Sequence, residues 1–365
     1  MKLTRAPAVT TTKKSGIANA WLLQCPPGLA MCLKKELQSI GAIARDHRLF
    51  VKRQRNHDLV FLNNLKDGVD LKQLRITEQI MSCPVFGRYK VSQTQLNTLA
   101  ESIAGDSPRR LLVQVAGRVF DRRDLLRWLT KELNSRGARL SEYNSEEDEE
   151  AAGGDDELWM FCIDENYYFG IPKQKSGQVA GRSSRVRERE GSLPPPIAAA
   201  LVFAASPRND DVVLDPVCGS GSLLAEVSHY APQASGIGVD IDPQAIEIAS
   251  QNLRGTAVEL FNSDSRHLAE KLRGRGISLV VANLPFGIKY GDRKTNADLY
   301  RQILEQSFQL SADRSSAWRA AVLTSDQESL STALAKIDFL SHQELFRVKI
   351  RGELAVAVLL KPRRS

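Results

Sequence analysis

The sequence predicts an α/β protein in which an N-terminal α+β region is followed by a doubly wound parallel sheet that ends in an antiparallel C-terminal hairpin. From residue 211 onward, short apolar segments alternate with helical segments of about ten residues, the order that builds parallel βαβ units. Before residue 173, strand-like and helical segments come in small repeated groups, which is typical of α+β modules. A chain of 365 residues is long enough for two or three domains.

Two changes of composition mark the expected domain boundaries. Residues 145–157 are dominated by Asp and Glu and contain two consecutive glycines, so we expect an acidic surface loop there. Residues 173–191 are rich in Gly, Ser and Arg and lie between two apolar regions, which predicts a linker. The expected organisation is a disordered tail over 1–16, an α+β region over 17–172 that contains the acidic loop, and a second domain over 192–365.

The α+β region is expected to hold two groups of elements. Its strands are short apolar runs, and its helices repeat apolar residues at helical spacing. Pro26-Pro27-Gly28 supplies a turn before the first helix, and the second helix is expected to begin near Asp121. In order, we expect a strand at 19–25, a helix at 29–40, strands at 49–54, 59–63 and 110–117, a helix at 121–133, and strands at 158–164 and 167–171.

The second domain is expected to alternate strands with helices until its last two strands. The tail over residues 345–361 reads as two strands joined across Arg351-Gly352, so an antiparallel hairpin should form one edge of the sheet. The expected strands are 211–215, 236–240, 258–262, 277–283 and 320–325, and the expected helices are 221–230, 243–253, 265–273, 297–308 and 328–337.

Composition favours a soluble, folded protein in a reducing compartment. Hydrophobic residues make up 42% and charged residues 25% of the chain, and no stretch approaches the roughly 18 apolar residues of a membrane span. The five cysteines form no C-x-x-C pair and have no histidine cluster nearby. The first sixteen residues are basic and Thr-rich, and their lack of amphipathic periodicity favours a disordered start over an organellar presequence. We expect a cytoplasmic protein without a metal site or membrane association.

The charge distribution points to a polyanionic partner. The net charge is +7, although eight acidic residues lie in the segment 146–157, so the rest of the chain is more basic than the total suggests. Nine basic residues against three acidic ones lie between Arg109 and Arg139, and four arginines crowd the linker. A solvated helix face is the alternative interpretation. A nucleic acid is the first candidate for this partner and an anionic membrane the second, and the residues expected to bind it are Arg118, Arg122, Arg123, Arg182, Arg185 and Arg187.

The first strand–helix junction of the second domain is a glycine turn. The run Asp215-Pro-Val-Cys218-Gly219-Ser-Gly221-Ser follows an apolar strand and opens a helix, where glycines let the backbone approach a ligand. The complete dinucleotide fingerprint fails because Leu224 occupies the third glycine position. A tight turn without a ligand is the alternative.

Acidic residues follow the next two strands. Asp240 ends its strand where a carboxylate can accept hydrogen bonds from both ribose hydroxyls. Asp242 precedes Pro243, and this pair predicts a helix cap. Asp264 is placed either to accept a hydrogen bond from an adenine amine or to cap the next helix.

The fourth strand leads into Asn283-Leu284-Pro285-Phe286-Gly287. The Asn283 side-chain oxygen and a neighbouring main-chain carbonyl can accept from a planar amine, while Phe286 can stack on the ring that carries it. Such a pocket suits the exocyclic amine of a nucleobase. An ordinary strand-ending turn is the alternative, which the order of the preceding sites disfavours.

These four runs together resemble the signature set of class I S-adenosylmethionine-dependent methyltransferases, in particular the THUMP-domain RNA guanine-N2 methyltransferases. The run GSLPPPIAAALVFAAS is similar to the helix that precedes their catalytic domain, and NAWLLQCPPGLAMCLKKELQSIGA is similar to their N-terminal ferredoxin-like segment. The resemblance implies a Rossmann-like methyltransferase domain over 192–365 and ferredoxin-like and THUMP-like modules over 17–172.

The resemblance also implies roles for individual residues. Asp215, Cys218, Gly219 and Gly221 would shape the loop under the methionine part of S-adenosylmethionine, Asp240 would hold the ribose and Asp264 would contact the adenine. Asn283, Pro285 and Phe286 would hold the target base, and Asn283 is also expected to contact the cofactor. Two residues depart from the commoner N-P-P-Y form: Leu284 replaces a proline and Phe286 a tyrosine.

The function expected from this resemblance is S-adenosylmethionine-dependent methylation of RNA, forming N2-methylguanosine in tRNA. An rRNA guanine-N2 enzyme and a nucleic-acid adenine-N6 enzyme are alternatives, because the pocket accepts either amine. An inactive RNA-binding scaffold is an alternative of another class. The chemistry requires no metal, and Asn283 is too weak a base to remove the proton before the methyl group moves.

Overall fold

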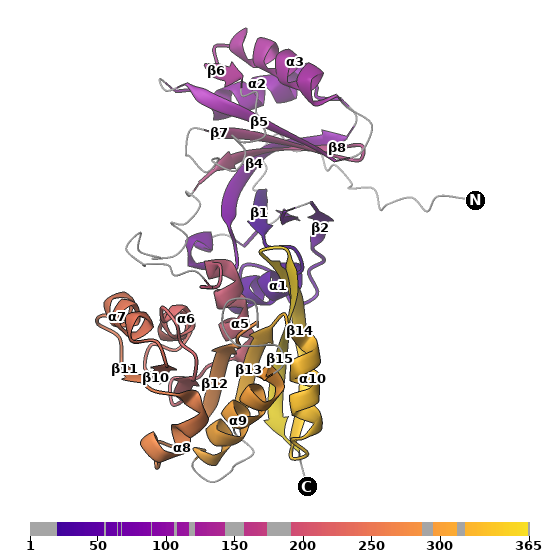
Figure 1. The fold of residues 1–365 in the computed structure, drawn as a ribbon. Helices are drawn as coiled ribbons and strands as arrows, with labels where there is room; N and C mark the ends of the chain where they lie inside the picture. Colours follow the sequence, from indigo (N-terminus) through magenta and orange to yellow (C-terminus); the bar gives the residue numbers. More distant parts are fainter. Residues whose placement is uncertain are drawn as a thin grey trace, which may run out of the picture. The chain divides into compact units, whose positions relative to one another are not determined.

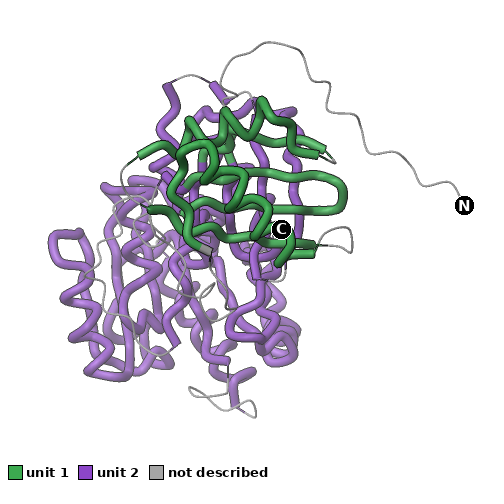
Figure 2. The backbone as a smooth tube through the Cα atoms, turned by 90° about the horizontal axis from the view of Figure 1, so that it is seen from above, with its two compact units in different colours: residues 1–21, 82–152, 156–171 green, residues 22–81, 153–155, 172–365 purple. Residues whose placement is uncertain are grey.

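The computed structural model describes residues 20–54, 56–63, 65–66, 68–88, 90–105, 108–116, 121–142, 157–173, 191–286, 295–311 and 318–363. The chain divides into two compact units, which Figure 2 shows in green and purple. Unit 1 comprises residues 1–21, 82–152 and 156–171. Unit 2 comprises residues 22–81, 153–155 and 172–365.

Unit 1 packs two helices on one face of a sheet (Figure 1). Its elements are β4 (Gln79–Arg88), α2 (Gln93–Ser102), β5 (Arg109–Ala116), α3 (Arg122–Asn134), β6 (Leu140–Glu142), β7 (Glu157–Ile163) and β8 (Asn166–Pro172), with the strand order β4-β8-β7-β5-β6. β5 runs parallel to β6 and β7, whereas β7 and β8 are antiparallel. The strands expected at 110–117, 158–164 and 167–171 and the helix beginning at Asp121 are confirmed. β4, α2 and β6 were not predicted from the sequence.

The prediction of an acidic loop over residues 145–157 is wrong for its last residue. Glu157 is the first residue of β7, and its side chain is fully buried. Burial is possible because both carboxylate oxygens have partners: Arg110 Nη2 lies 2.9 Å from one oxygen, and Trp159 Nε1 donates to the other at 3.0 Å. The rest of this loop, the tail over 1–16 and most of the linker lie outside the described residues.

The N-terminal part of unit 2 contains β1 (Trp21–Cys25), α1 (Ala30–Ser39), β2 (Phe50–Arg53), β3 (Asp58–Leu62) and a short 3₁₀ helix, η1 (Leu71–Gln73). The strand order is β2-β3-β1, and β2 and β3 are antiparallel. The expected strands and helix in this part are confirmed.

Residues 22–81 belong to the same compact unit as residues 172–365. The sequence had instead predicted a single α+β region over residues 17–172. A buried polar cluster accounts for the difference. Arg75 forms a bidentate ion pair with Glu226, with N···O distances of 2.5 and 3.0 Å. Glu36 accepts a hydrogen bond from the Tyr230 hydroxyl at 2.5 Å and from the backbone amide of Arg75 at 2.9 Å.

The larger part of unit 2 is a doubly wound sheet, so the predicted fold class is confirmed. The strand order is β11-β10-β9-β12-β13-β15-β14, in which the neighbours from β11 to β13 are parallel and the last two pairs are antiparallel. The strands are β9 (Val212–Asp215), β10 (Ser235–Asp240), β11 (Val258–Asn262), β12 (Leu279–Asn283), β13 (Arg319–Thr324), β14 (Leu340–Ile350) and β15 (Glu353–Pro362). The order reverses between β9 and β12, the position where open α/β sheets bind ligands.

The helices of this part are α5 (Pro195–Ala205), α6 (Ser222–Tyr230), α7 (Pro243–Asn252), α8 (Leu268–Lys271), α9 (Asn296–Gln309) and α10 (Gln327–Ala335), with a 3₁₀ turn, η3 (Ser265–His267). The helix expected over 265–273 is thus a 3₁₀ turn followed by one helical turn. The C-terminal hairpin is confirmed at the sheet edge, and it turns across Arg351 and Gly352, both of which have positive φ angles. No helix among the described residues is long and apolar enough to cross a membrane.

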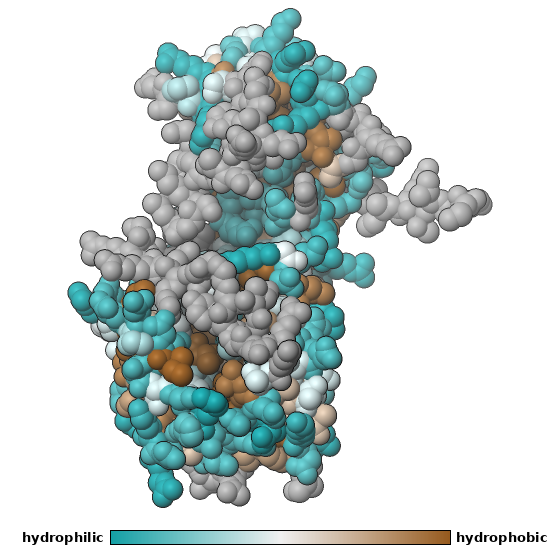
Figure 3. Space-filling view, in the orientation of Figure 1, coloured by the Kyte–Doolittle hydropathy of each residue, from teal (hydrophilic) through white to brown (hydrophobic). Residues whose placement is uncertain are grey.

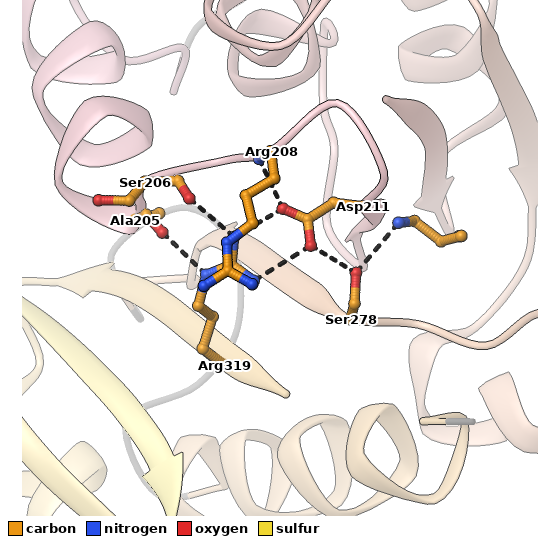
Figure 4. A network of polar contacts seen from close by, with 7 residues as sticks. Ala205, Ser206, Arg208, Asp211, Ser278 and Arg319 are labelled. Atoms are coloured by element: carbon orange, nitrogen blue, oxygen red, sulfur yellow. Dashed lines mark hydrogen bonds and ion pairs between the residues drawn. The ribbon is translucent and has the colours of Figure 1, made fainter. Parts of the chain in front are cut away.

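A buried ion pair lies at the amino-terminal ends of β9 and β13 (Figure 4). Two guanidinium nitrogens of Arg319 lie 2.6 and 3.1 Å from the carboxylate oxygens of Asp211, and the same guanidinium donates to the carbonyls of Ala205 and Ser206. The Ser278 hydroxyl donates to Asp211 at 2.7 Å. Every oxygen of the buried carboxylate therefore has a partner, and α5, β9, β12 and β13 are held in one register.

Candidate functional site

The carboxyl ends of three adjacent parallel strands form the candidate site. β9 pairs with β10 on one side and with β12 on the other, so Asp215, Asp240 and Asn283 end their strands at the same edge of the sheet. The sequence predicted this grouping because parallel strands present their carboxyl ends together. Figure 3 shows hydrophobic residues at the molecular surface in the region of β10 and β12.

The glycine turn after β9 is fixed in shape by its glycines. Gly219 and Gly221 have φ angles of +54° and +82°, a region that other residues rarely adopt. A Cβ atom on Gly221 would lie 2.7 Å from Leu253 Cδ1, so this position also lacks room for a side chain. The Gly219 amide donates to Asp240 Oδ2 at 2.8 Å, and the Cys218 amide donates to the Val239 carbonyl at 2.9 Å. These two hydrogen bonds therefore hold the glycine turn against the carboxyl end of β10.

Asp215 and Asp240 differ in environment. Asp215 is 1% exposed, and burial, opposed by a hydrogen bond from the Val217 amide and reinforced by the nearby Asp240 charge, raises the pKa of Asp215 to about 8. Asp215 thus carries a proton at neutral pH. Asp240 is half-buried and accepts the Gly219 amide on one oxygen and the Asp242 amide, at 2.9 Å, on the other. Each oxygen of Asp240 retains a lone pair for one hydroxyl of a ribose.

The structure places Asp242 and Asp264 at element starts. Asp242 caps α7 by accepting from the Gln244 amide, as predicted. Asp264 caps η3 by accepting from the Arg266 amide, and the Arg266 guanidinium donates to both of its oxygens. The hydrogen bonds from Arg266 hold the pKa of Asp264 below its ordinary value, although partial burial opposes this. The capping interpretation of Asp264 is therefore observed, and its contact with an adenine stays a prediction.

Ile241, the residue after Asp240, was not predicted as part of the site. Its side chain is 68% exposed, more than any other large hydrophobic side chain among the described residues. Asn262 donates to the carbonyls of Asp240 and Ile241 at 3.0 and 2.9 Å and fixes this turn. An exposed apolar side chain beside the Asp240 carboxylate suits the flat ring of a nucleoside. Its signal in the sequence was an apolar residue between two aspartates.

Asn283 carries a buried oxygen without a hydrogen-bond partner among the described atoms, its side-chain Oδ1. The next residue, Leu284, is anchored by its amide to the Leu323 carbonyl at 2.9 Å. A buried acceptor of this kind needs a donor from a bound water or a ligand. Phe286, three residues after Asn283, is half-buried, and Gly287 lies outside the described residues.

A polar network under Pro285 was also missed. The Pro285 carbonyl accepts from the Tyr300 hydroxyl and from Asn296 Nδ2, the latter at 3.4 Å. Tyr300 also contacts the Thr324 hydroxyl at 3.0 Å, and Asn296 donates to Asp326 at 2.9 Å. Asn296 and Tyr300 are fully buried and stand one helical turn apart on α9. Two polar residues at this spacing on an apolar helix face were the available signal.

The predicted RNA-binding arginines are only partly visible. Arg123 is exposed in the first turn of α3. Arg122 is half-buried, and its Nε donates to the Val113 carbonyl at 2.9 Å, so part of its guanidinium is already engaged. Arg118, Arg182, Arg185 and Arg187 lie outside the described residues. Within the described ranges, no group of His, Cys, Asp and Glu side chains has the arrangement of a metal site.

Comparison with known proteins places these residues in context. Residues 182–355 match the family model described as RMKL-like, methyltransferase domain. The chain is 25% identical over 181 residues to the tRNA (guanine(6)-N(2))-methyltransferase THUMP3 of Mus musculus, a match that covers 45% of this chain and 35% of that protein. It is 29% identical over 144 residues to the tRNA (guanine(10)-N2)-dimethyltransferase of Methanothermobacter thermautotrophicus, covering 38% of this chain and 41% of that protein.

The fold has a match over almost the entire chain. TrmN from Thermus thermophilus superposes with a TM-score of 0.74 and 18% sequence identity, covering 94% of this chain and 100% of that chain. The fold is therefore shared along both halves. The matches to the two curated relatives span 35% and 41% of the lengths of those proteins.

Proposed function

We propose that this chain, whose residues 182–355 match the model of the RMKL-like methyltransferase domain, is an S-adenosylmethionine-dependent RNA methyltransferase that forms N2-methylguanosine in tRNA. The observation that carries the proposal is the orphaned Oδ1 atom of Asn283 at the carboxyl edge of the sheet. The relatives named as tRNA guanine-N2 enzymes support the choice of substrate. The five buried, unpaired cysteines support a location in the reducing cytoplasm.

The residues at the strand ends fit S-adenosylmethionine. Gly219 and Gly221 leave the turn after β9 without side chains, which suits the close approach of an amino-acid moiety to the backbone. Asp240 has the remaining acceptor capacity for a ribose, and Ile241 offers an apolar surface for an adenine. When bound there, S-adenosylmethionine supplies an activated methyl group on a sulfonium sulfur.

Asn283 and the main chain after it would orient the acceptor amine. The Asn283 oxygen would accept one N–H of the amine, which both satisfies this buried atom and aims the nitrogen lone pair. The Pro285 carbonyl already accepts from Tyr300 and Asn296, so the second N–H is assigned to the Leu284 carbonyl. Phe286 would stack on the base, and the proton would leave to water after the methyl group has moved.

Methyl transfer to separate nucleic acids tests the proposal. A labelled methyl group from S-adenosylmethionine is offered to unmodified total tRNA, to rRNA and to duplex DNA, and the products are digested to nucleosides. The proposal expects N2-methylguanosine in tRNA. Label confined to rRNA, or found as N6-methyladenine, would contradict the assigned substrate.

A variant distinguishes an enzyme from an inactive scaffold. Asn283→Ala should lower kcat by about 10²- to 10³-fold while the protein still binds S-adenosylhomocysteine. Asn209→Ala is the matched control, because Asn209 lies before the amino end of β9, at the opposite edge of the sheet, and should leave kcat unchanged. A wild-type protein that binds the cofactor but methylates none of the nucleic acids would favour the scaffold.

A further inference from the structure

The C-terminal hairpin extends beyond the carboxyl edge of the catalytic sheet. β13 ends at Thr324, which pairs with Val356 of β15, and β14 and β15 continue past this point to their turn. Figure 1 shows the hairpin of β14 and β15 in yellow. We call the part beyond the end of β13, residues 348–355, the hairpin tip. It belongs to the same edge of the sheet as the candidate site.

The hairpin tip is attached to the rest of unit 2 from two sides. Gln327, the first residue of α10, donates through Nε2 to the Leu354 carbonyl at 3.2 Å. Gln327 directly follows Asp326, a member of the polar network described above. On β14, a Cβ atom on Gly28 would lie 2.2 Å from the Arg347 carbonyl oxygen, so the turn before α1 packs directly on the residue that precedes the tip. These contacts hold the tip next to the segment expected to bind the target base.

Two cations and one large apolar side chain of the tip are exposed. These are Lys349, Arg351 and Leu354, and Leu354 is 44% exposed although it is apolar. Lys349 and Leu354 are paired in register and therefore project from the same face of the hairpin. Among the described residues, neither Lys349 nor Arg351 has a side-chain hydrogen bond or an ion pair. Glu353 is the acidic residue of the tip, and it is exposed as well.

Arg351 occupies a backbone conformation that arginine rarely adopts. Its φ angle is +50° and that of Gly352 is +89°, so both central residues of this hairpin turn have positive φ. Asn-Gly, Asp-Gly and Gly-Gly are the pairs that such a turn favours. Among the described residues, the other non-glycine residues with positive φ are Asp164 and Ser206, which are short and polar. A long cation at a position that suits asparagine or glycine indicates a role outside the turn itself.

The order of the strands limits the path of an RNA substrate along this edge. In the proposed function, S-adenosylmethionine occupies the ends of β9 and β10, where the glycine turn and Asp240 lie, and the target base lies at Asn283 on β12. The RNA that flanks the target base must then cross the other neighbours of β12, which are β13, β15 and β14 in that order. Adjacent strands are about 4.7–4.9 Å apart, so β14 lies about 14 Å from β12. The hairpin tip therefore stands on the side of the site that the cofactor leaves free.

We propose that Lys349 and Arg351 of the hairpin tip bind phosphates of the RNA strand that flanks the target nucleotide, with Leu354 against a ribose or a base. Exposed cations neutralise phosphates, and the planar arginine side chain can donate two hydrogen bonds to one phosphate. This inference rests on the proposed function for the position of the target base. It adds a substrate contact in unit 2 to the arginines expected to bind RNA from α3 and the linker.

Direct RNA binding by the full chain tests the proposal. The probe is fluorescein-labelled unmodified total tRNA, measured by anisotropy at several KCl concentrations without cofactor. The variant K349Q/R351N removes both charges, and asparagine suits the positive φ angle at position 351. It should bind tRNA at least fivefold more weakly at low salt. The slope of log K against log salt should fall by about 1.4–1.8, because each lost phosphate contact contributes about 0.7–0.9.

The matched control is R273Q/K361Q, which removes two exposed cations from the opposite edge of the same sheet. Lys361 pairs with Ser341 at the far end of the same hairpin, and Arg273 precedes the amino end of β12. This control should change tRNA affinity less than twofold.

Two further measurements separate lost contacts from lost structure. Arg351→Asn alone should unfold at the same urea concentration as wild type or a higher one, because asparagine adopts positive φ more readily than arginine. All variants should bind S-adenosylhomocysteine with wild-type affinity. In methyl transfer, K349Q/R351N should raise the KM for tRNA by about the factor lost in binding, while its kcat stays within twofold of wild type.

Two outcomes would overturn the inference: wild-type tRNA affinity and salt slope in K349Q/R351N, or an equal loss in R273Q/K361Q. Unchanged tRNA affinity together with a changed sedimentation coefficient in K349Q/R351N would instead assign the tip to a contact between two copies of the chain. RNA binding is measured without methyl transfer, so the two proposals fail separately. Binding that depends on the tip in a protein that methylates no nucleic acid would support an RNA contact at the tip and contradict the proposed function. Formation of N2-methylguanosine with an unchanged KM in K349Q/R351N would do the reverse.

Discussion

The Asp240 carboxylate accepts the Gly219 amide at 2.8 Å, so the ribose-binding candidate and the glycine turn are held by one hydrogen bond. Asp240 therefore has two tasks. It fixes the turn after β9, and it presents its remaining lone pairs to a ligand. A change at Asp240 should act on both parts of the cofactor site.

Asp240→Asn should weaken binding of S-adenosylhomocysteine by about ten- to hundredfold. The amide keeps one acceptor oxygen but loses the charge and the second acceptor, and hydrogen bonds to a charged group contribute about 1.5–3 kcal/mol. Isothermal titration calorimetry measures the change. Asp242→Asn is the control, because asparagine caps a helix as well as aspartate and should leave the affinity unaltered. An equal loss in both variants would contradict the assigned role.

Tyr300→Phe should lower kcat at least tenfold while cofactor affinity stays within twofold. The variant removes one of the two donors to the Pro285 carbonyl and leaves only Asn296, so it loosens the segment that carries Asn283 and Phe286. Tyr230→Phe is the control, since it removes the hydroxyl of a half-buried tyrosine that contacts Glu36 rather than the loop. Both variants should lose about 1–3 kcal/mol of unfolding free energy. If the two variants had the same kcat, Tyr300 would have only a structural role.

The elevated pKa of Asp215 predicts a pH dependence of stability. A buried acid whose pKa is raised to about 8 holds its proton when folded, whereas the unfolded chain releases it near pH 4, so the group's contribution is lost as pH rises through this range. The loss is at most about 1.4 kcal/mol per pH unit. Asp215→Asn removes the titration but keeps an acceptor for the Val217 amide. Urea unfolding at pH 5 and pH 7 should therefore show a smaller decline in the variant, and parallel declines would contradict the assignment.

Arg319→Met should reduce the free energy of unfolding by about 3–5 kcal/mol at pH 7, because it leaves the Asp211 carboxylate buried without its cation. Burial alone raises the pKa of Asp211, but hydrogen bonds from Arg319, Ser278 and the Arg208 amide lower it below its ordinary value. The ion pair's contribution is thus present above about pH 4 and lost as pH falls through the lowered pKa.

Urea unfolding should accordingly show a smaller difference in the free energy of unfolding between wild type and Arg319→Met below about pH 4. Arg275→Met serves as the comparison, since its pair with Glu259 is solvent-exposed and should contribute less than about 1 kcal/mol. A loss in Arg319→Met no larger than that in Arg275→Met would show that the buried pair does not stabilise the fold.

Local patterns were sufficient to predict the catalytic sheet and the edge where its residues meet. Asp215, Asp240 and Asn283 each follow an apolar run, and parallel topology then brings them together. Local patterns failed for β4, because Pro84 and Gly87 interrupt a strand whose residues pair with neighbours distant in sequence. α2 is largely polar, although Ser92 and Gln95 form a capping box that the sequence displays.

Long-range pairings explain the remaining differences. Nothing near Arg75 or Glu36 in the sequence indicates Glu226 or Tyr230 as partners. The boundary predicted at the linker separated residues that the fold unites. The Pro285 network was not predicted for the same reason, because Thr324 and Asp326 reach it from the end of β13 and the start of α10.

The buried cluster of Glu36, Arg75, Glu226 and Tyr230 has a consequence for synthesis on the ribosome. Arg75 emerges 151 residues before Glu226, and Glu36 emerges 194 residues before Tyr230. At a translation rate of about 5–20 residues per second, these charged groups wait roughly 8 to 40 seconds for their partners. Residues 82–171, the bulk of unit 1, are complete within that interval and can fold first. The nascent chain must therefore keep residues 22–81 from misfolding until α6 is made, and this early segment is where a chaperone would be most needed.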